Sequence, residues 1–586
     1  MNMKRLFTSC IILLATLPML AQGWPEKYEG VMLQGFYWDS YADTKWTNLE
    51  SQADELSQFF DLIWVPNSAY ANDLKNNMGY HPVYWFDHKS AFGTEAQLRS
   101  MIQTFKQKGT GIIEDVVINH RASVDGNWLN FPAETYKGET YQLTAADICQ
   151  DDESKNSGYS PTGAKDTGQG WGGARDLDHT SANVQKNVNA YLDFLLNDLG
   201  YVGFRYDFVL GYAPRYIGQY NQTAKPQFSV MECWEKYSTI LTWLNGTKVD
   251  GVIQSAAFDF PMKTNINDVF SNASNWSKLN NAALSTNEEL ARYAVTFVDN
   301  HDTGRQGESP LYANVEAANA FILTLPGTPC VWLSHWKTYK TTIKKLILTR
   351  KAAGLNSQSS IVTKQATSNG YVLTVQGTKG NVMLLLGTAT ANTGGYKLAV
   401  EGSNFKMYVT NSVDLSALDN IKDDTFTIPD CCVVGEGEVC AFFEAPASYT
   451  GIKCWAWDSK NNYTGGTWPG QACTKVGTNN GNNVWKWTYT GTLTTLPTNI
   501  IFNGSFGQTS DLDFKNGGYY NEAGALQGTV TGIQLPTATT GGNRLLKVYT
   551  IDGHLLRVLP SDTTEAEALN QLKHGIYVIN GKKIVK

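Results

Sequence analysis

The sequence predicts an α/β fold: a (β/α)8 barrel with an excursion domain after its third strand, followed by all-β C-terminal domains. Up to Asn356, short apolar runs alternate with amphipathic stretches, a pattern typical of βαβ units around a parallel sheet. One interval in this region is far too long for an ordinary loop. Beyond Asn356 the helical periodicity gives way to short strands between turn signals, which indicates antiparallel β-structure.

Seven apolar runs are expected to be buried parallel strands of the barrel. They are 60–66, 111–120, 202–208, 228–234, 251–260, 294–302 and 327–333. Amphipathic stretches such as 95–109 and 181–200 are expected to be helices between them. Alternation at this pace indicates roughly eight strands, as in a TIM barrel. A doubly wound open sheet is the alternative, although no Gly-x-Gly-x-x-Gly motif follows any of the runs.

The long interval, about 121–180, lies between the run that ends at His120 and the helix that begins near Ser181. It is rich in Gly, Asp, Asn and Thr and is far longer than a typical βα loop. We therefore expect it to protrude from the barrel as a separate excursion domain.

The rest of the chain divides by composition and pattern. A catalytic barrel is predicted over 23–356, a β-sheet domain over 357–445, a second all-β module over 446–530, and a linker with a short β-rich tail over 531–586. Nine cysteines are present, and none has the Cys-x-x-Cys spacing of a zinc site. One or two disulfides are expected near the C-terminal modules, with a pairing that the sequence does not determine.

Composition and the N-terminal segment restrict the location and the partners. Residues 1–22 combine Lys4, Arg5, an apolar run and small residues, the pattern of a signal peptide, so we expect a secreted or cell-surface protein. No later run is long and apolar enough to span a membrane. The net charge of -7 and the lack of Lys/Arg runs argue against nucleic acid. An aromatic content of 12% against 17% charged residues suits stacking on neutral sugars, although large cores also use aromatics.

Charged and polar residues gather at the ends of four predicted strands. They are Asp115, Asn119 and His120, then Arg205 and Asp207, then Glu232, and finally Asp299, His301 and Asp302. Arg205 and Asp207 share a strand face, since residues two apart point the same way, and a structural ion pair would explain that pair alone. Four strands that bring carboxylates, histidines and an arginine to one rim of a barrel instead indicate an active site.

Glycoside cleavage is the chemistry that such a set suits. One carboxylate acts as nucleophile or base and another as acid, because the transition state resembles an oxocarbenium ion. A neighbouring arginine keeps a carboxylate ionised, which explains why Arg205 stands beside Asp207. Histidine side chains can hydrogen-bond the hydroxyl groups of a sugar.

Four of these segments, DVVINH (115–120), GFRYDF (203–208), MECW (231–234) and FVDNHD (297–302), resemble the signature regions of glycoside hydrolase family 13, the α-amylase family. In order and spacing they most resemble plant-like α-amylases. The resemblance covers about 25–390 and includes GFYWDS (35–40), MGYHP (78–82), GTEAQLRSMI (93–102), DTGQGWGGARDLDH (166–179) and LPGTPC (325–330).

The resemblance implies a role for each matching residue. Asp207 would be the nucleophile, Glu232 the general acid/base and Asp302 the third carboxylate, which grips sugar hydroxyls. The subsite of the reacting sugar would be lined by Tyr80, which stacks beneath the sugar, and by His120, Arg205 and His301. Retention would require the carboxyl groups of Asp207 and Glu232 to lie about 5–5.5 Å apart.

Three positions near these motifs are less clear. Leu210 stands where the family often has a lysine, which puts the contacts to the leaving-group side in doubt. Trp234 is a candidate for apolar cover of Glu232. Glu114, a charge at the buried end of a strand, has no function that the sequence indicates.

The resemblance also implies a calcium ion, with side-chain ligands Asn119, Asp166 and Asp176 and main-chain oxygens of Gln169 and Gly211. Calcium prefers carboxylate, amide and carbonyl oxygens, and this set supplies all three kinds. Because Asn119 and Gly211 belong to the barrel and the other residues to the excursion, one ion would hold the two together.

The module at 446–530 contains IKCWAWDSK (452–460), TWPGQACTKVG (467–477), WKWTY (485–489) and IIFNGSFGQTSDL (500–512). In these segments it resembles a family 26 carbohydrate-binding module, which recognises starch. The resemblance points to Trp455, Trp457 and Gln508 as sugar contacts, with Trp485 and Trp487 packed inside. The alternative is that one face of the sandwich uses its tryptophans as core. The tail resembles the sorting domains of type IX secretion, which implies an export machinery as partner, unless it is only an accessory β-domain.

Together these features predict a secreted, calcium-dependent, endo-acting α-amylase that binds starch and other α-1,4-glucans. One alternative is a relative that hydrolyses maltooligosaccharides or pullulan. The other is a non-catalytic starch-binding protein, which would be expected to have lost one of the three carboxylates, whereas all three are present.

Overall fold

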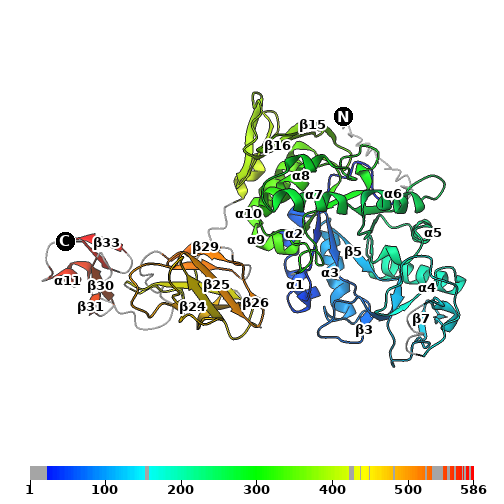
Figure 1. The fold of residues 1–586 in the computed structure, drawn as a ribbon, viewed down its shortest axis with the longest axis horizontal. Coiled ribbons are helices and arrows are strands. Elements are labelled where there is room, and N and C mark those ends of the chain that lie inside the picture. The colour runs from blue at the N-terminus through cyan, green and yellow to red at the C-terminus, as the bar shows by residue number, and fades with distance from the viewer. Residues whose placement is uncertain are drawn as a thin grey trace, which may run out of the picture. The chain divides into compact units, whose positions relative to one another are not determined.

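The computed structural model describes residues 23–586 except 152–157, 306, 422–427, 436, 448, 480–481, 522–523, 525, 531–545, 551–554, 560–562, 571, 573–575 and 580–581. The expected signal peptide at 1–22 and the first part, 531–545, of the expected linker and tail lie outside the described residues. The chain forms two compact units, which meet in the sequence between Asp423 and Asp424 (Figure 1). Each unit is described by itself.

The first unit contains a closed barrel of eight parallel strands, which confirms the predicted (β/α)8 fold. In chain order the strands are β1 (Met32–Gln34), β2 (Leu62–Val65), β5 (Gly111–Val116), β10 (Gly203–Tyr206), β11 (Phe228–Met231), β12 (Ala256–Phe258), β13 (Ala294–Phe297) and β14 (Thr328–Trp332). The sequence did not predict β1, because a three-residue strand is too short to give a periodic signal. Its pairing with both β2 and β14 closes the barrel.

Helices surround the strands (Figure 1). They are α1 (Trp46–Ser51), α2 (Ala53–Phe59), α3 (Glu95–Gln107), α4 (Ala182–Asp193), α5 (Arg215–Ala224), α6 (Tyr237–Gly246), α7 (Phe260–Phe270), α8 (Val315–Thr324), α9 (Leu333–Thr338) and α10 (Lys340–Ala353). Helix α3 begins at a capping box formed by Thr94 and Gln97. It buries Leu98, Met101, Ile102 and Phe105, which lie on one face at helical spacing.

The excursion leaves the barrel after β5 and returns before α4, as predicted. Strand β6 (His120–Arg121) pairs with β9 (Arg175–Asp176), so the two ends of the excursion lie side by side. Strands β7 (Glu134–Tyr136) and β8 (Glu139–Tyr141) form a hairpin whose turn, Lys137 and Gly138, has two positive φ angles, as a type I′ turn requires.

A five-stranded antiparallel sheet completes the first unit, in the order β15-β16-β17-β19-β18. Its strands are β15 (Ser360–Ala366), β16 (Gly370–Gln376), β17 (Asn381–Gly387), β18 (Tyr396–Gly402) and β19 (Phe405–Thr410). Alternate residues such as Leu373, Leu384 and Leu386 belong to the same hydrophobic core as the barrel. The residues between them, Val372, Met383 and Leu385, form a small cluster of their own on the other face.

The second unit opens with a two-sheet β-sandwich. One sheet has the order β23-β24-β20-β28-β29, and the other has the order β22-β21-β25-β26 with β27 beside β25. Its strands are β20 (Cys440–Ala445), β21 (Lys453–Trp457), β22 (Gln471–Ala472), β23 (Thr474–Asn479), β24 (Asn482–Thr488), β25 (Asn499–Gly504), β26 (Gly507–Gln508), β27 (Leu512–Asp513), β28 (Gly518–Tyr520) and β29 (Leu526–Thr529).

The predicted boundary between residues 445 and 446 is wrong. Strand β20 was expected to end the preceding β-domain, but it pairs with β24 and β28 in the centre of a sandwich sheet. The first unit ends at Asp423, well before this strand. A run of β-strands carries no signal of its own for where one sheet stops and the next begins, so composition misplaced the boundary.

The predicted β-rich tail forms a four-stranded antiparallel sheet in the order β31-β30-β32-β33. The elements are β30 (Leu546–Thr550), β31 (Leu555–Leu559), α11 (Glu565–Leu569), β32 (Ile576–Ile579) and β33 (Lys582–Val585). Within the described part of the chain, no helix is long and apolar enough to cross a membrane.

The expected disulfides are not formed, since all eight described cysteines are free. Cys454 and Cys473 illustrate the reason. Both are buried in one core of the sandwich, but in the pairing of β21 with β22 the partner of Cys454 is Gln471, so Cys473 is out of register. Burial raises the pKa of both thiols.

Candidate active site

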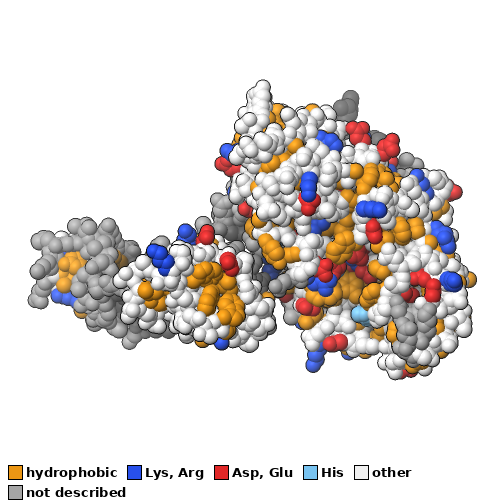
Figure 2. All heavy atoms as spheres, viewed as in Figure 1, with side chains coloured by type: hydrophobic (Ala, Val, Ile, Leu, Met, Phe, Trp, Pro, Cys, Tyr) orange, Lys and Arg blue, Asp and Glu red, His pale blue; other side chains and the backbone are white. Residues whose placement is uncertain are grey.

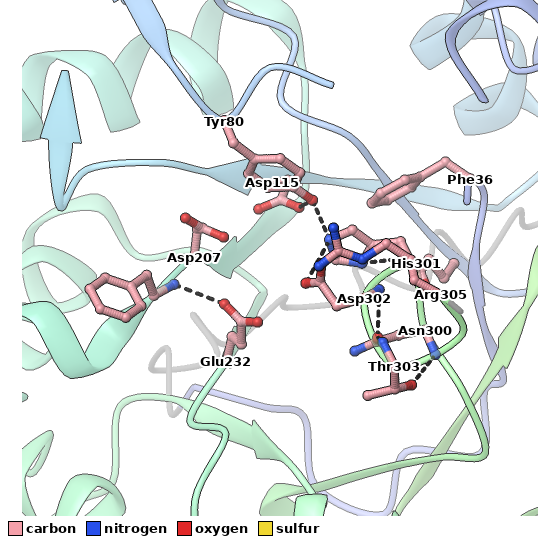
Figure 3. A network of polar contacts seen from close by, with 12 residues as sticks. Phe36, Tyr80, Asp115, Asp207, Glu232, Asn300, His301, Asp302, Thr303 and Arg305 are labelled. Atoms are coloured by element: carbon pink, nitrogen blue, oxygen red, sulfur yellow. Dashed lines mark hydrogen bonds and ion pairs between the residues drawn. The ribbon is translucent and has the colours of Figure 1, made fainter. Parts of the chain in front are cut away.

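The predicted site residues meet at the carboxyl ends of neighbouring barrel strands. Arg205 lies on β10, and Asp207 and Glu232 directly follow β10 and β11. Asp115 lies near the end of β5, which also pairs with β10. His301 and Asp302 follow β13. Figure 3 shows the carboxyl groups of Asp207, Glu232 and Asp302 around one space, and Figure 2 shows acidic side chains in a hollow of the first unit.

Arg205 is the centre of the site. One amino group of its buried guanidinium, Nη1, lies 2.6 Å from Oδ1 of Asp115 and 2.6 Å from Oδ1 of Asp207. The other, Nη2, lies 3.0 Å from Oε2 of Glu232. The guanidinium carbon lies 4.9 Å from the centre of the Trp64 ring. Arg205 and Asp207 therefore do form an ion pair on one strand face, and the same guanidinium also contacts Glu232, the predicted acid.

Glu232, the predicted acid, is further held by a strained backbone. Phe208 has φ 41° and ψ 53°, a left-handed conformation that is rare for a bulky residue and that occurs mostly at functional sites. In this conformation its N–H donates to Oε2 of Glu232 at 2.9 Å. The bonds from Phe208 and Arg205 both fall on Oε2, so Oε1 is the oxygen that can present a proton to a substrate.

Burial raises the pKa of Glu232 above its usual range. The negative charges of Asp207 and Asp302 act in the same direction, whereas Arg205 and the Phe208 N–H act against it. Glu232 is thus favoured in its protonated form near neutral pH. This is the state that a general acid needs.

The aromatic rings of Tyr80 and His301 lie beside Asp302 and form one wall of the site, the aromatic wall. The Tyr80 hydroxyl donates to Oδ2 of Asp115 at 2.9 Å and lies 2.6 Å from Nε2 of His301. Nδ1 of His301 accepts from the Gln34 amide at 2.9 Å, so Nε2 carries the ring hydrogen. Burial, together with the charges of Arg205 and Arg305, lowers the pKa of His301 well below its usual value, and the ring is neutral.

Asp302 is fixed by its own loop. Its backbone N–H donates to Oδ1 of Asn300 at 2.9 Å. Its Oδ2 lies 3.2 Å from Nε2 of His301, and its Oδ1 lies 3.1 Å from a guanidinium nitrogen of Arg305. Burial raises the pKa of Asp302, while Arg205 and Arg305 oppose that rise.

His120 is close to the site, but both of its ring nitrogens have partners within the protein. Nε2 donates to the carbonyl oxygen of Tyr80 at 2.8 Å, and Nδ1 accepts from the Asn119 amide at 3.2 Å. The ring also packs on Trp171, with ring centres 4.2 Å apart. Burial lowers the pKa of His120 to about 4. In this structure His120 fixes the backbone that carries Tyr80.

Sequence reasoning missed several residues of the network. Trp38 lies parallel to Tyr80, with ring centres 5.9 Å apart and planes 4° apart, and the guanidinium carbon of Arg305 lies 4.2 Å from the centre of the Trp38 ring. Trp38 was visible in the GFYWDS motif, but no local pattern shows that it meets a loop so distant in sequence. Trp234, the suggested cover for Glu232, stacks on Phe260 and remains 41% exposed.

Asp299, which the sequence placed at the same rim, has a different surrounding. Its Oδ1 lies 2.5 Å from Nζ of Lys263 on α7 and accepts from the Thr303 hydroxyl at 3.1 Å. Its Oδ2 accepts from the backbone N–H of Leu311 at 3.0 Å. Asp299 therefore holds the ends of the loop that carries His301 and Asp302.

Glu114 has a structural explanation. It neighbours Asp115 on β5, so the two side chains point to opposite faces of the strand. Its Oε1 accepts from the backbone N–H and the hydroxyl of Ser68, both at 2.8 Å, and that hydroxyl lies 2.7 Å from Nδ1 of His88. Burial raises the pKa of Glu114 to about 8. Glu114 is therefore a protonated polar group of the core behind the site.

Replacing Glu114 by Gln is expected to change how stability depends on pH. The wild-type carboxyl keeps its proton when folded up to about pH 8 but loses it near pH 4.5 when unfolded. Between these values the unfolded state binds fewer protons, so the free energy of unfolding falls by up to about 1.4 kcal/mol per pH unit. Gln has no proton that titrates in this range. The free energy of unfolding of the variant, measured with urea from pH 5 to 8, should therefore rise relative to that of wild type. The control is Glu288→Gln, at an exposed position, whose free energy of unfolding should depend on pH as that of wild type does. The same pH dependence in Glu114→Gln would contradict the assignment of Glu114 as a protonated core residue.

The predicted calcium ligands converge where the excursion joins the barrel. The Asn119 amide donates to Oδ1 of Asp176 at 3.0 Å. The N–H of Gln169 donates to the carbonyl oxygen of Leu210 at 2.8 Å, which brings the 166–169 loop onto Gly211. A Cβ on residue 211 would lie 2.0 Å from Oδ1 of Asn119, so any larger residue there would displace the Asn119 side chain. The described residues contain no group of three or more His, Cys, Asp or Glu side chains placed for a metal, and this set has only two carboxylates. Its mixture of carboxylate, amide and carbonyl oxygens nevertheless suits calcium.

The tryptophans predicted to bind starch lie on one face of the sandwich. Trp455 and Trp457 are half-buried and alternate with buried Cys454 and Ala456, so they point outward from β21. Asn503 on the paired strand β25 lies opposite the exposed Gln508. Trp468, which the sequence analysis missed, is 49% exposed and meets Trp455 edge to face. Of the tryptophans expected to be inside, Trp487 is fully buried and Trp485 is half-buried.

The fold and the site together define a class of protein. A (β/α)8 barrel whose mouth presents two carboxylates bridged by one arginine is suited to the hydrolysis of glycosidic bonds. Comparison with known proteins then gives the family. Residues 60–335 match the family profile described as "Alpha amylase, catalytic domain".

Two relatives and one solved structure illustrate the similarity. "Probable alpha-amylase 2" of Arabidopsis thaliana is 30% identical over 370 residues, which cover 59% of this chain and 86% of the relative. "Glucan 1,4-alpha-maltotetraohydrolase" of Roseateles saccharophilus is 29% identical over 426 residues, which cover 66% and 74%. A crystal structure of α-amylase from Geobacillus thermoleovorans aligns with a TM-score of 0.47 at 13% identity over 65% of this chain and 98% of that one. The chain belongs to the α-amylase family and is a glycoside hydrolase acting on α-glucans.

Proposed function

We propose that this enzyme is a secreted α-amylase that cleaves α-1,4-glucosidic bonds within starch chains and retains the anomeric configuration. The observation that carries the proposal is the single guanidinium of Arg205, which contacts Asp207 at 2.6 Å and Glu232 at 3.0 Å. One cation that contacts both carboxyl groups keeps them close together, and closely spaced carboxyl groups are the arrangement of retaining enzymes.

In the first step Asp207 attacks the anomeric carbon while Glu232 gives its proton to the glucosidic oxygen of the leaving chain. A covalent bond forms between the sugar and Asp207 as the glucosidic bond breaks. Asp302 binds hydroxyl groups of the reacting sugar, and the Tyr80 ring stacks against it. The neutral His301 donates from Nε2 beside both of them.

In the second step Glu232, now ionised, takes a proton from a water molecule, which attacks the same carbon and releases the sugar from Asp207. Two inversions at one carbon give net retention. Leu210 offers no charge to the leaving-group side, and Trp234 is the exposed aromatic nearest in sequence to Glu232. Stacking on Trp234 is therefore our candidate for substrate binding on that side.

The test is the product pattern from soluble starch. Iodine staining should fall quickly relative to the release of reducing sugar, a ladder of oligosaccharides should appear, and the first products should be α-anomers. Release of β-anomers would contradict retention.

A hydrolase of maltooligosaccharides or pullulan is the second candidate, which the similarity to a maltotetraohydrolase favours. It predicts one dominant product size, or faster turnover of pullulan than of starch.

We also propose that one calcium ion is bound by Asn119, Asp166 and Asp176, with the carbonyl oxygens of Gln169 and Gly211. When bound, the ion would supply charge that holds the excursion on the barrel. Asn119 neighbours His120, and His120 fixes the backbone of Tyr80, so this region supports the wall of the active site.

Removing calcium is expected to lower the melting temperature by on the order of 5 °C, because a ligand that binds only the folded state stabilises that state. Calcium should restore the melting temperature after treatment with a chelator, and magnesium should not. Asp176→Asn should show a smaller chelator effect than wild type. Asp125→Asn, an exposed carboxylate in the excursion, serves as the control. A melting temperature that no chelator changes would refute the site.

The outward tryptophan face supports the further proposal that the sandwich binds starch. Trp455→Ala with Trp457→Ala is expected to lower adsorption to starch granules at least tenfold, because each ring that stacks on a sugar contributes on the order of 1 kcal/mol. Hydrolysis of short soluble maltooligosaccharides should not change. Leu526→Ala, an exposed apolar residue on the other sheet, is the matched control. Unchanged granule adsorption in the double variant would instead favour a structural role.

We propose finally that residues 1–22 direct export and that the tail sheet is a sorting domain. Expression in a bacterium that has type IX secretion, with and without residues 546–586, tests this. Full-length enzyme should reach the cell surface or medium, and the truncated enzyme should remain in the periplasm. Equal export of both forms would make the tail an accessory domain.

A further inference from the structure

Arg305 links Asp302 to an aromatic stack. Its guanidinium nitrogen Nη2 lies 3.1 Å from Oδ1 of Asp302, and its guanidinium carbon lies 4.2 Å from the centre of the Trp38 ring. The Trp38 ring is in turn parallel to Tyr80 and nearly parallel to His301, with interplanar angles of 4° and 17°. Figure 3 shows Arg305 beside His301 and Asp302.

Among the charged groups around Asp302, Arg305 is the cation that pairs with it directly. The charged and titratable groups that face Asp302 are Arg205, Arg305, His301, Glu232 and Tyr80. His301, Tyr80 and Glu232 are neutral near pH 7, because burial shifts each of them toward its uncharged form. Arg205 makes its ion pairs with Asp115, Asp207 and Glu232. The direct ion pair of Asp302 is with Arg305, and a mostly buried carboxylate is costly without such a partner.

We propose that Arg305 is a positioning residue that holds Asp302 ionised and correctly oriented while it stacks on Trp38, the ring that lies parallel to Tyr80. This inference rests on the proposed function, in which Asp302 grips the reacting sugar. The planar guanidinium can stack on an indole ring and donate to a carboxylate at the same time, which a lysine ammonium cannot do as well. Arg305 thus couples the orientation of a carboxylate to that of the aromatic wall.

The test compares Arg305→Gln and Arg305→Lys with wild type across pH. Removing the cation raises the pKa of Asp302, so the acid limb of kcat/KM should move to higher pH in Arg305→Gln. We expect kcat to fall by about 10- to 100-fold with KM changed by less than about threefold, since an interaction needed in the transition state is lost. Arg305→Lys should restore the position of the acid limb but only part of kcat.

Arg99→Gln is the matched control. Arg99 forms an ion pair with Glu95 one helical turn away and is 38% exposed, compared with 36% for Arg305, but it lies on α3 outside the site. A merely structural role for Arg305 would lower the melting temperature without moving the acid limb, and that result would overturn the proposal. Wild-type kcat with an unmoved acid limb in Arg305→Gln would overturn it as well.

A second measurement separates this inference from the proposed function. Thermal unfolding across pH is recorded for wild type, Arg305→Gln, Asp302→Asn and the double variant. Arg305→Gln should change the pH dependence of the melting temperature when Asp302 is present. The change should be much smaller in the Asp302→Asn background, where the exposed carboxyl of Glu308, 3.9 Å from Nη2 of Arg305, remains. The same change in both backgrounds overturns the proposal. If wild type fails to cleave starch, the proposed function fails, and this cycle still decides the role of Arg305.

Discussion

Replacing Asp207 by Asn is expected to reduce starch hydrolysis by about 10⁴-fold or more. An amide has nearly the same shape as the carboxylate but does not attack the anomeric carbon. The side chain is 12% exposed and ends at the mouth, so the substitution should leave the barrel folded. Reducing-sugar release measures the effect, with circular dichroism and melting temperature as checks on folding.

Asp54→Asn is the control for this substitution, because Asp54 is 89% exposed on α2 and far from the chemistry in sequence. It should keep full activity. A fluorinated glycosyl fluoride should in addition label wild-type Asp207 covalently, as peptide mass spectrometry would show. Activity of Asp207→Asn within tenfold of wild type, or a label on another carboxylate, would refute the assignment of the nucleophile.

Replacing Glu232 by Gln is expected to lower kcat on starch by about 10³-fold, because the leaving chain would depart without a proton. The effect should depend on the leaving group. Fluoride needs no proton, so the first step with α-glucosyl fluoride should be slowed by less than tenfold. Glu235→Gln, in the same loop but outside the network, is the control. An equal loss on starch and on the fluoride would show that Glu232 is not the acid.

Glu232 also determines how kcat/KM on starch is expected to change on the alkaline side of the pH profile. As the proposed acid, Glu232 must be protonated when the bond breaks. Burial raises its pKa, so the protonated form persists through neutral pH and is lost on the alkaline side. Wild-type kcat/KM on starch should therefore fall as pH rises above neutral. In Glu232→Gln this alkaline limb should be absent, since the amide has no proton to lose.

The fold was predictable because its signals are local and repeated. Buried strands and amphipathic helices alternate in the sequence, and the period of a strand places Arg205 and Asp207 on one face without any knowledge of tertiary structure. The motifs at the strand ends gave the other site residues by resemblance. The three-residue strand β1 escaped prediction because nothing in so short a run is periodic.

The rest of the site depends on loop geometry, which local sequence patterns do not encode. The left-handed conformation of Phe208, which points an N–H at Glu232, is imposed by its surroundings on a residue that disfavours it. Trp38 and Arg305 stack although they belong to loops at opposite ends of the barrel sequence. Asp299 looked like a site residue because of its neighbours, but its ion pair with Lys263 belongs to the support of the loop.

The arginine shared by Asp207 and Glu232 has a consequence for the order of events in one turnover. In the proposed mechanism Asp207 is an ester while the sugar is bonded to it, and its negative charge is gone. The repulsion from Asp207 that helped to raise the pKa of Glu232 then disappears. Arg205, in turn, no longer has the negative charge of Asp207 as a partner. The proton affinity of Glu232 therefore drops at the moment when it must accept a proton from water. In the proposed mechanism, the first step itself thus converts Glu232 from an acid into a base.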